Sequence, residues 1–202
     1  MTEKKATPGK IIIKNVRISY PHLFDKQKAK DGEPSYNAAF ILPKNHPQLF
    51  AIREKINTVA QIVYKDKWET ILKGLKANGK GGLQDGDSKP ESAGYEGNLF
   101  FNANNKSERP DVRDRNKNVL TKEDGKLLDG GDYVNVSVEF WAMNHKEHGK
   151  RINCKLLGVQ FDHEGPKFGS GATAEEDDFD DLGDIGDDNY ESAEDEDLDD
   201  LG

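Results

Sequence analysis

One segment, residues 133–143, alternates apolar and polar side chains without a break, and this pattern restricts the fold more than any other. The apolar positions are Val134, Val136, Val138, Phe140 and Ala142. A period of two places alternate residues on opposite faces of a β-strand. A loop at 144–150 and a second β-rich run at 151–161 follow, so the sequence predicts an antiparallel hairpin with one buried face.

The return strand of this hairpin changes its own alternation. Its apolar residues share one parity up to Leu156 and take the other parity from Leu157 onward. An extra residue in one strand of an antiparallel pair produces such a shift, and it also bends the strand and increases its twist. We therefore predict a β-bulge near 156–158 and a strongly curved sheet.

The remaining patterns complete a barrel with one helical insertion. Runs rich in β-branched and aromatic residues predict strands at 10–20, 35–42 and 97–104, and Pro21 ends or bends the first of them. Between the second and third runs the apolar period becomes three and four, which predicts helices over 47–64 and 68–77. We expect a loop at 80–94 and a charged ribbon or loop at 110–118. The fold class is thus mainly β: a curved antiparallel barrel with a helical insertion at about 47–78.

The charge of the chain is divided sharply along its length. The last 31 residues, 172–202, hold sixteen Asp or Glu and no Lys or Arg. The whole chain has a net charge of -9, so residues 1–171 have 29 basic against 22 acidic residues, a net charge of +7. We expect three parts: a flexible N-terminus at 1–9, one domain at 10–168, and a disordered acidic tail at 169–202. A basic domain of this kind favours a polyanionic partner, and the tail can compete with that partner.

Two similar segments of the tail, FDDLG and LDDLG, place apolar residues in an acidic field. We interpret them as short docking motifs for partner proteins, with Phe179, Leu182, Leu198 and Leu201 as the contact residues.

Cysteine content and hydropathy limit the compartment. The single cysteine, Cys154, excludes an internal disulfide and a Cys-based zinc site. No apolar run is long enough for a signal peptide or a membrane span. We expect a cytoplasmic protein that does not bind membranes.

The polar face of the final hairpin is the first candidate for binding. Tyr133 and Trp141 share it, and Arg151, Asn153 and Lys155 have the matching parity on the return strand. Single-stranded nucleic acids need aromatic rings on which bases stack and cations that neutralise phosphates. The alternative is that Trp141 packs under the helical insertion and the cations are ordinary surface residues.

The hairpin loop carries Lys146 and Lys150 together with His145 and His148. It is interpreted either as a phosphate-facing tip or as a solvated loop. Two histidines three residues apart also indicate a metal, but no cysteine or nearby carboxylate pair completes a site, so we expect no metal and no cofactor.

A charged segment between Lys106 and Lys117 includes Arg109, Arg113 and Arg115. These arginines either line a groove that follows a nucleic-acid backbone or pair with the neighbouring acidic residues.

Three further aromatic residues are candidates for base stacking. Tyr20 lies at the end of the first strand, where a ring can equally cap the core. Phe100 and Phe101 are adjacent, so one of them should face outward from its strand.

Patterns for catalysis are missing from the sequence. There is no phosphate-binding loop, dinucleotide fingerprint, zinc-protease motif or nucleophile elbow, so we do not expect an enzyme. Asp85-Gly86-Asp87 is either a simple turn or a weak site for a divalent cation.

Several short segments, taken in order, resemble a known family. These are Ser19-Tyr-Pro-His-Leu-Phe24, the strand ending in Phe40-Ile-Leu-Pro-Lys44, Asp85-Gly-Asp87, Tyr95-Glu-Gly with Phe101-Asn-Ala103, and Gly149-Lys-Arg-Ile-Asn153 with Gly158-Val-Gln-Phe161. Together they are similar to bacteriophage single-stranded DNA-binding proteins. The resemblance implies an OB-fold, helix-destabilising binding of single strands in phage replication and recombination, and an acidic tail that contacts replication proteins.

Two features depart from that family. Many such tails end in an aromatic residue, whereas this chain ends in Leu201-Gly202. Only two strands precede the helices, although a plain OB-fold has three, so either the first strand bends into two or the insertion is displaced.

The predicted function is therefore sequence-tolerant binding of single-stranded DNA in the cytoplasm of a phage host. Duplex DNA would bind more weakly, and a polymerase, helicase or nuclease would bind the tail. The alternative is an acidic-tailed adaptor or DNA mimic that inhibits a host DNA-binding protein. The oligomeric state stays open, with a homodimer among the alternatives.

Overall fold

The fold is described from a computed structural model, which covers residues 7–28, 32–124 and 128–168. All of these residues lie in the first of the chain's two units, Met1–Gly169. The predicted acidic tail and its four docking residues lie outside the described residues.

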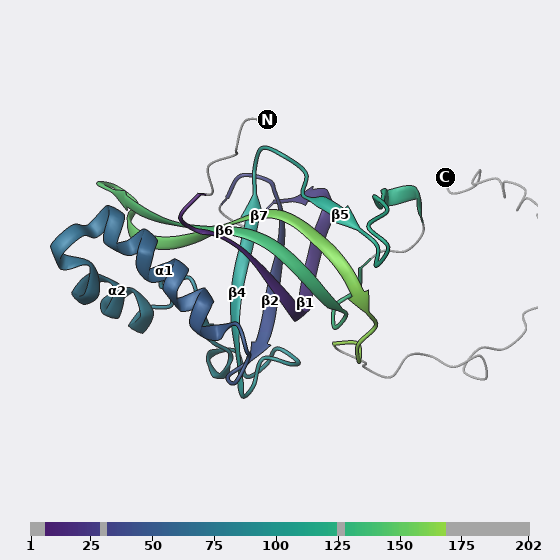
Figure 1. The fold of residues 1–202 in the computed structure, drawn as a ribbon, viewed down its shortest axis with the longest axis horizontal. Coiled ribbons are helices and arrows are strands. Elements are labelled where there is room, and N and C mark those ends of the chain that lie inside the picture. The colour runs from purple at the N-terminus through teal and green to yellow at the C-terminus, as the bar shows by residue number, and fades with distance from the viewer. Residues whose placement is uncertain (1–6, 29–31, 125–127, 169–202) are drawn as a thin grey trace, which may run out of the picture. The chain divides into compact units, whose positions relative to one another are not determined.

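Five strands form a closed barrel (Figure 1). They are β1 (Lys10–Gln27), β2 (Ser35–Pro43), β4 (Asn98–Asn105), β6 (Tyr133–His145) and β7 (Gly149–His163). β1 pairs with β2 on one side and with β6 on the other, and β4 and β7 meet in parallel at Asn104 and Lys155. The cyclic order β1–β2–β4–β7–β6 confirms the expected OB-fold.

β1 curves because its ladders are interrupted three times. The register shifts between Ile13 and Val16, between Ser19 and His22, and between His22 and Gln27. Pro21 lies in the second interruption, where its missing N–H removes no ladder hydrogen bond. Pro21 therefore bends the strand, which continues to Gln27.

The helices α1 (Leu49–Tyr64) and α2 (Trp68–Ala77) are joined by the 3₁₀ turn η1 (Lys65–Lys67). Ile52, Ile56 and Val59 of α1 are buried in the core, as the helical period predicts. The helices follow the second strand of the barrel, so the insertion is displaced from the position that a plain OB-fold gives it. Figure 1 shows both helices beside the far part of the β6–β7 hairpin, where the Tyr64 hydroxyl lies 2.9 Å from the Met143 carbonyl and donates to it.

The predicted hairpin and its bulge are confirmed. Val134, Val136 and Val138 are fully buried. Ser137 pairs with Gly158 but Val138 pairs with Leu156, so Leu157 is the extra residue. The bulge keeps Leu156 and Val159 both in the core.

Shorter elements complete the structure: β3 (Gln84–Asp85), η2 (Gly86–Ser88), β5 (Asp111–Arg113) and η3 (Lys122–Asp124). β3 extends the sheet beyond β4, and β5 extends it beyond β7. The predicted loop at 80–94 thus contains the short strand β3, and the segment 110–118, predicted as a ribbon or loop, contains the short strand β5. Among the described residues, no helix is long and apolar enough to cross a membrane.

Candidate nucleic-acid interface

A groove of about 250 Å³ lies on the outer face of β2 and β4. Small side chains leave room for this groove: Ala39 of β2 lines it and pairs with Ser19 of β1 and with Asn102 of β4. The next outward pair is Asn37 and Asn104. The lining residues are Tyr20, Gln27, Ser35, Asn37, Ala38, Ala39, Lys89, Tyr95, Asn102, Ala103 and Asn104.

The amides of this groove have unused hydrogen-bonding capacity. Asn102 and Asn104 are exposed, and neither side chain has a partner among the described residues. The Asn37 amide donates to the Ser35 carbonyl at 3.0 Å, which leaves its own oxygen as an acceptor. An amide offers both donors and an acceptor, so these side chains can bind the edges of nucleotide bases.

Tyr20 forms one side of the groove with its ring 63% exposed. Its φ of 47° lies in the left-handed region, which a bulky residue rarely adopts. The register shift between Ser19 and His22 imposes this conformation. A large exposed ring beside a floor of small residues has the geometry for base stacking.

A loop that follows β3, residues 86–97, forms the opposite side. Tyr95 from this loop packs with Ala39, Ile41 and Phe100 in a small apolar cluster on the outer face of the sheet. Burial raises the pKa of the Tyr95 hydroxyl. The Lys89 ammonium lies 5.1 Å from the centre of the Tyr95 ring, so the loop places a cation at the edge of the groove.

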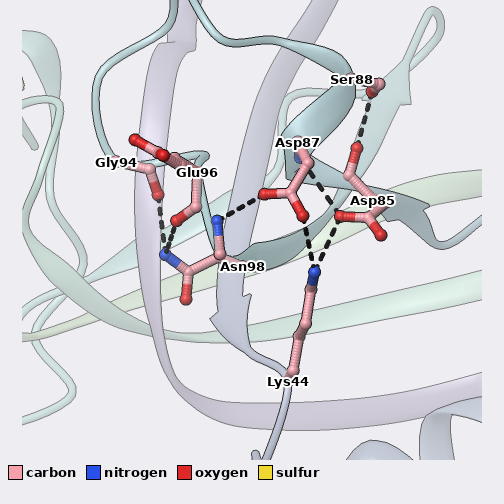
Figure 2. A network of polar contacts seen from close by, with 8 residues as sticks. Lys44, Asp85, Asp87, Ser88, Gly94, Glu96 and Asn98 are labelled. Atoms are coloured by element: carbon pink, nitrogen blue, oxygen red, sulfur yellow. Dashed lines mark hydrogen bonds and ion pairs between the residues drawn. The ribbon is translucent and has the colours of Figure 1, made fainter.

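A polar network closes this loop at its base (Figure 2). The Lys44 ammonium lies 2.8 Å from an Asp87 oxygen and 3.2 Å from an Asp85 oxygen, and the second Asp87 oxygen accepts a hydrogen bond from the Gly97 N–H at 2.6 Å. The Lys44 hydrogen bond is the main cause that lowers the pKa of Asp87, and the Gly97 N–H lowers it further. Because Lys44 already lies between these two carboxylates, the network favours the turn interpretation of Asp85-Gly86-Asp87.

Lys155 connects this groove to the face that the sequence predicts. It pairs with Asn104 where β4 meets β7, so both side chains lie on the outside of the barrel. On β7, Asn153 has the same outward parity and pairs with Trp141. The β2–β4 groove and the outer face of the final hairpin therefore form one continuous surface.

The two aromatic residues predicted on the hairpin differ in accessibility. Trp141 is 44% exposed, so it does not pack under the helices. Tyr133 is half-buried, and its ring stacks on His163 at 4.4 Å between ring centres. The Arg17 guanidinium lies 5.7 Å from the Tyr133 ring. Trp141 is thus the more accessible of the two rings.

The expectation that Phe100 or Phe101 presents an exposed ring is wrong, because both are fully buried. Phe101 stacks on Phe40 in the barrel core, 5.3 Å between ring centres. Phe100 does face outward, but Tyr95 covers it at 5.0 Å. Adjacent strand residues occupy opposite faces as expected, yet the 86–97 loop buries the outer face at this position.

Each arginine of the charged segment has a partner within the domain, and one of them pairs inside the segment itself. Arg113 donates to Asp111 at 2.7 Å and to the Lys117 carbonyl at 2.8 Å. Arg115 lies 3.8 Å from Asp162. Arg109 lies 5.6 Å from the Phe24 ring. For Arg113 the geometry favours the internal salt-bridge interpretation over the groove rim.

The cations of the hairpin loop are accessible. Lys146 and Lys150 are exposed, and neither has a side-chain partner among the described residues. Arg151 is half-buried and donates to the His148 carbonyl at 3.3 Å. The loop therefore presents two unpaired ammonium groups at the end of the hairpin.

The sequence did not predict a binding role for five polar and aromatic residues of the groove: Asn37, Lys89, Tyr95, Asn102 and Asn104. Parity within 35–42 and 97–104 does mark the three asparagines as outward-facing. Their meeting on one floor depends on the β2–β4 register, and the position of Lys89 and Tyr95 depends on how the loop packs.

Comparison with known proteins identifies the family of this chain. The family model described as "Enterobacter phage Enc34, ssDNA-binding protein" matches residues 9–195. Protein p50 of Acyrthosiphon pisum secondary endosymbiont phage 1 is 40% identical over 180 residues, which are 86% of this chain and 94% of that protein.

Solved structures agree with the family match. The single-stranded DNA-binding protein of bacteriophage Enc34, in complex with single-stranded DNA, is 29% identical with a TM-score of 0.60; the match covers 83% of this chain and all of that one. The bacteriophage T7 protein gp2.5, also a single-stranded DNA-binding protein, shares the fold at 12% identity and a TM-score of 0.52, over 82% of this chain and 96% of its own. The chain described here therefore belongs to the family of the Enc34 phage single-stranded DNA-binding protein.

Proposed function

We propose that this chain binds single-stranded DNA along the surface that begins in the β2–β4 groove and continues past Lys155 to Trp141. One observation carries the proposal: an exposed ring, free amides and cations follow one another across neighbouring strands. Tyr20 and Trp141 stack bases, Asn102 and Asn104 contact base edges, and Lys155 neutralises phosphate. The Enc34 relative, solved in complex with single-stranded DNA, supports single-stranded DNA as the ligand.

Binding of this kind is tolerant of sequence and sensitive to salt. Every base has a face that can stack, so rings select poorly among bases. Each neutralised phosphate releases counterions, and about four such contacts give a log–log salt slope near -3 for a single strand, at roughly 0.7 per contact. Lys89, Lys146, Lys150 and Lys155 are the accessible cations that supply these contacts.

The cellular role follows from this activity. A protein that coats single strands destabilises duplex DNA and protects the strands, which serves DNA replication and recombination. Duplex DNA binds more weakly because its bases are not free to stack on Tyr20 and Trp141. The acidic tail recruits replication proteins through Phe179, Leu182, Leu198 and Leu201, and it screens the groove when DNA is absent.

The tail's attachment point supports screening of the groove. Phe168, the last described residue, packs against the cluster that contains Ala39 and Tyr95, and both of these residues also line the groove. Glu175 follows seven residues later, at most about 25 Å along an extended chain. The acidic segment thus begins, in sequence, only a few residues after a residue that packs beside the groove.

The experiment that tests the proposal is a titration of the full chain with oligothymidylate, followed by tryptophan fluorescence at two salt concentrations. We expect saturable quenching that weakens as salt increases. Tyr20→Ala should weaken binding by about 1–3 kcal/mol, the stacking contribution of one base.

Phe50→Ala is the matched control, because Phe50 is 76% exposed on α1 and lies outside the proposed surface. Equal losses in the two variants would refute the placement of the DNA. A complete lack of binding at low salt would refute the proposed function and favour the acidic-tailed adaptor. The adaptor function does not explain why residues 1–171 have a net charge of +7.

A further inference from the structure

The tip of the β6–β7 hairpin gathers three side chains that can bind a metal ion. His145 pairs with Gly149 in the last rung of the ladder, and Lys146, Glu147 and His148 make the turn between them. Gly149 has a φ of 73°, the left-handed conformation that closes a three-residue hairpin loop. This tight turn brings the side chains of 145, 147 and 148 to one place.

Hydrogen bonds within the turn fix the first of the three. His145 Nδ1 lies 3.2 Å from the backbone nitrogen of Glu147 and 3.2 Å from that of His148, and it accepts from both N–H groups. These contacts hold the ring over the turn, and coordination of an ion by His145 replaces them with the bond to the metal. The His148 ring stacks on the His145 ring at 4.7 Å between centres.

The ligand atoms of the three residues all lie within 4.8 Å of one another, and all three residues are exposed. Two atoms bound to one zinc ion at about 2.1 Å lie at most about 4.2 Å apart, so small rotations of exposed side chains produce a coordinating arrangement. The Glu147 carboxylate and the His148 ring have no hydrogen-bond or ion-pair partner among the described residues. They can therefore bind an ion without breaking an existing contact.

We propose that His145, Glu147 and His148 form a site for a divalent transition-metal ion. Two imidazoles and one carboxylate suit Zn²⁺, Ni²⁺ or Cu²⁺ better than Mg²⁺ or Ca²⁺, which prefer oxygen ligands. Three protein ligands leave further coordination positions to water. Glu147 supplies a single carboxylate between the two histidines. The sequence-based expectation of no metal required a cysteine or a carboxylate pair, so it left this residue out.

The site differs in chemistry from the other acidic places in the chain. Asp85 and Asp87 already bind the Lys44 ammonium. The tail supplies many carboxylates but no histidine. A preference for Zn²⁺ or Ni²⁺ over Mg²⁺ that depends on His148 therefore distinguishes the hairpin tip from the tail.

Calorimetric titration of the metal-free full chain with Zn²⁺ at neutral pH tests the proposal. We expect one binding event per chain, weakened at least tenfold by His148→Ala and several-fold by Glu147→Gln. Cu²⁺ should also quench Trp141, which is four strand residues, about 13 Å, from His145. Thermal melting without metal should be the same for all variants, because the tip is exposed.

His163→Gln is the matched control. His163 is an exposed histidine 3.0 Å from the Asp162 carboxylate but without a second histidine beside it. Its substitution should change Zn²⁺ affinity by less than twofold. Equal Zn²⁺ affinity in the wild type and in His148→Ala, or no heat of binding in the wild type, would overturn the proposal.

Discussion

Tyr20 combines an exposed ring with a backbone conformation that its side chain disfavours. A φ of 47° costs a non-glycine residue free energy that its surroundings must supply. Here the pairing of β1 with β2 on both sides of the register shift holds this conformation. As a result, the Tyr20 ring lies at the edge of the groove. Strained residues of this kind are frequent at binding sites, so both the strain and the exposure of Tyr20 favour a role in binding.

Lys155 should act through charge alone. Its replacement in Lys155→Met removes one phosphate contact, so the log–log salt slope for oligothymidylate should become shallower by about 0.7. Lys73→Met, on the exposed side of α2, should leave the slope unchanged. Parallel titrations at several salt concentrations measure both, and an unchanged slope for Lys155→Met would place the phosphate path elsewhere.

The Lys44–Asp87 pair gives a prediction with a defined pH range. The pKa of Asp87 lies below its ordinary value of 3.8, mainly because of the Lys44 hydrogen bond. A lowered pKa in the folded state means that the contribution of Asp87 to stability is present above pH 3.8 and is lost as the pH falls through the folded pKa. Lys44→Met should bring the pKa of Asp87 back toward 3.8.

Carboxyl chemical shifts during an acid titration, recorded by NMR, measure this pKa directly. Asp66→Asn, in the exposed η1 turn, is a control that should leave the Asp87 titration unchanged. The effect on the melting temperature will be small, because exposed ion pairs contribute little. A pKa of Asp87 that is the same in the wild type and Lys44→Met would show that contacts other than the Lys44 hydrogen bond stabilise the charged form.

At the scale of elements, substitutions at two glycines allow the stability effect of close packing to be measured apart from that of helix propensity. A Cβ on Gly9 would lie 1.8 Å from the Phe140 carbonyl oxygen, where β1 begins to pair with β6. Gly9→Ala should therefore destabilise the barrel by about 1–3 kcal/mol or more, since backbone cannot rotate away.

Gly74→Ala is the matched substitution, because nothing lies within 4 Å of its Cβ position in the middle of α2. It should stabilise the fold by about 0.5–1 kcal/mol through helix propensity. Urea unfolding of both variants measures the two free energies. Opposite signs are expected, and a stabilising Gly9→Ala would mean that the start of β1 is displaced without cost.

The elements that sequence could predict are those that local periodicity determines. The period of two in 133–143, the parity change at Leu157 and the period of α1 each result from burial of one face, so the observed elements match them closely. Exposure of Trp141 follows from the same alternation. The burial of Phe100 could not be predicted, because the 86–97 loop that covers it has no periodicity. The groove also depends on the pairing of Asn37 with Asn104, which are distant in sequence.

At the scale of the whole molecule, residues 1–171 have a net charge of +7 and residues 172–202 are acidic, and we propose that the acidic tail competes with DNA for the basic domain. Removing residues 172–202 should tighten binding of oligothymidylate, most strongly at low salt, where charges are least screened. The fragment 1–171 retains every buried core residue, since these lie between Ile13 and Phe161. Fluorescence titrations of the full chain and the fragment at two salt concentrations make the comparison, and equal affinity at low salt would refute the screening role of the tail.

The junction of β4 and β7 has a consequence for how the barrel opens. Asn104 and Lys155 are the one pair that joins these strands in the register of the described residues, and the Asn105 side chain adds a hydrogen bond to the Leu156 carbonyl at 3.0 Å. All the other neighbouring strands of the barrel share longer ladders. On heating, the barrel should therefore open first by separation of β4 from β7. If DNA binds across Asn104 and Lys155 as we propose, it connects the edges of β4 and β7. Amide exchange along these two edges should then slow as the protein becomes saturated with DNA.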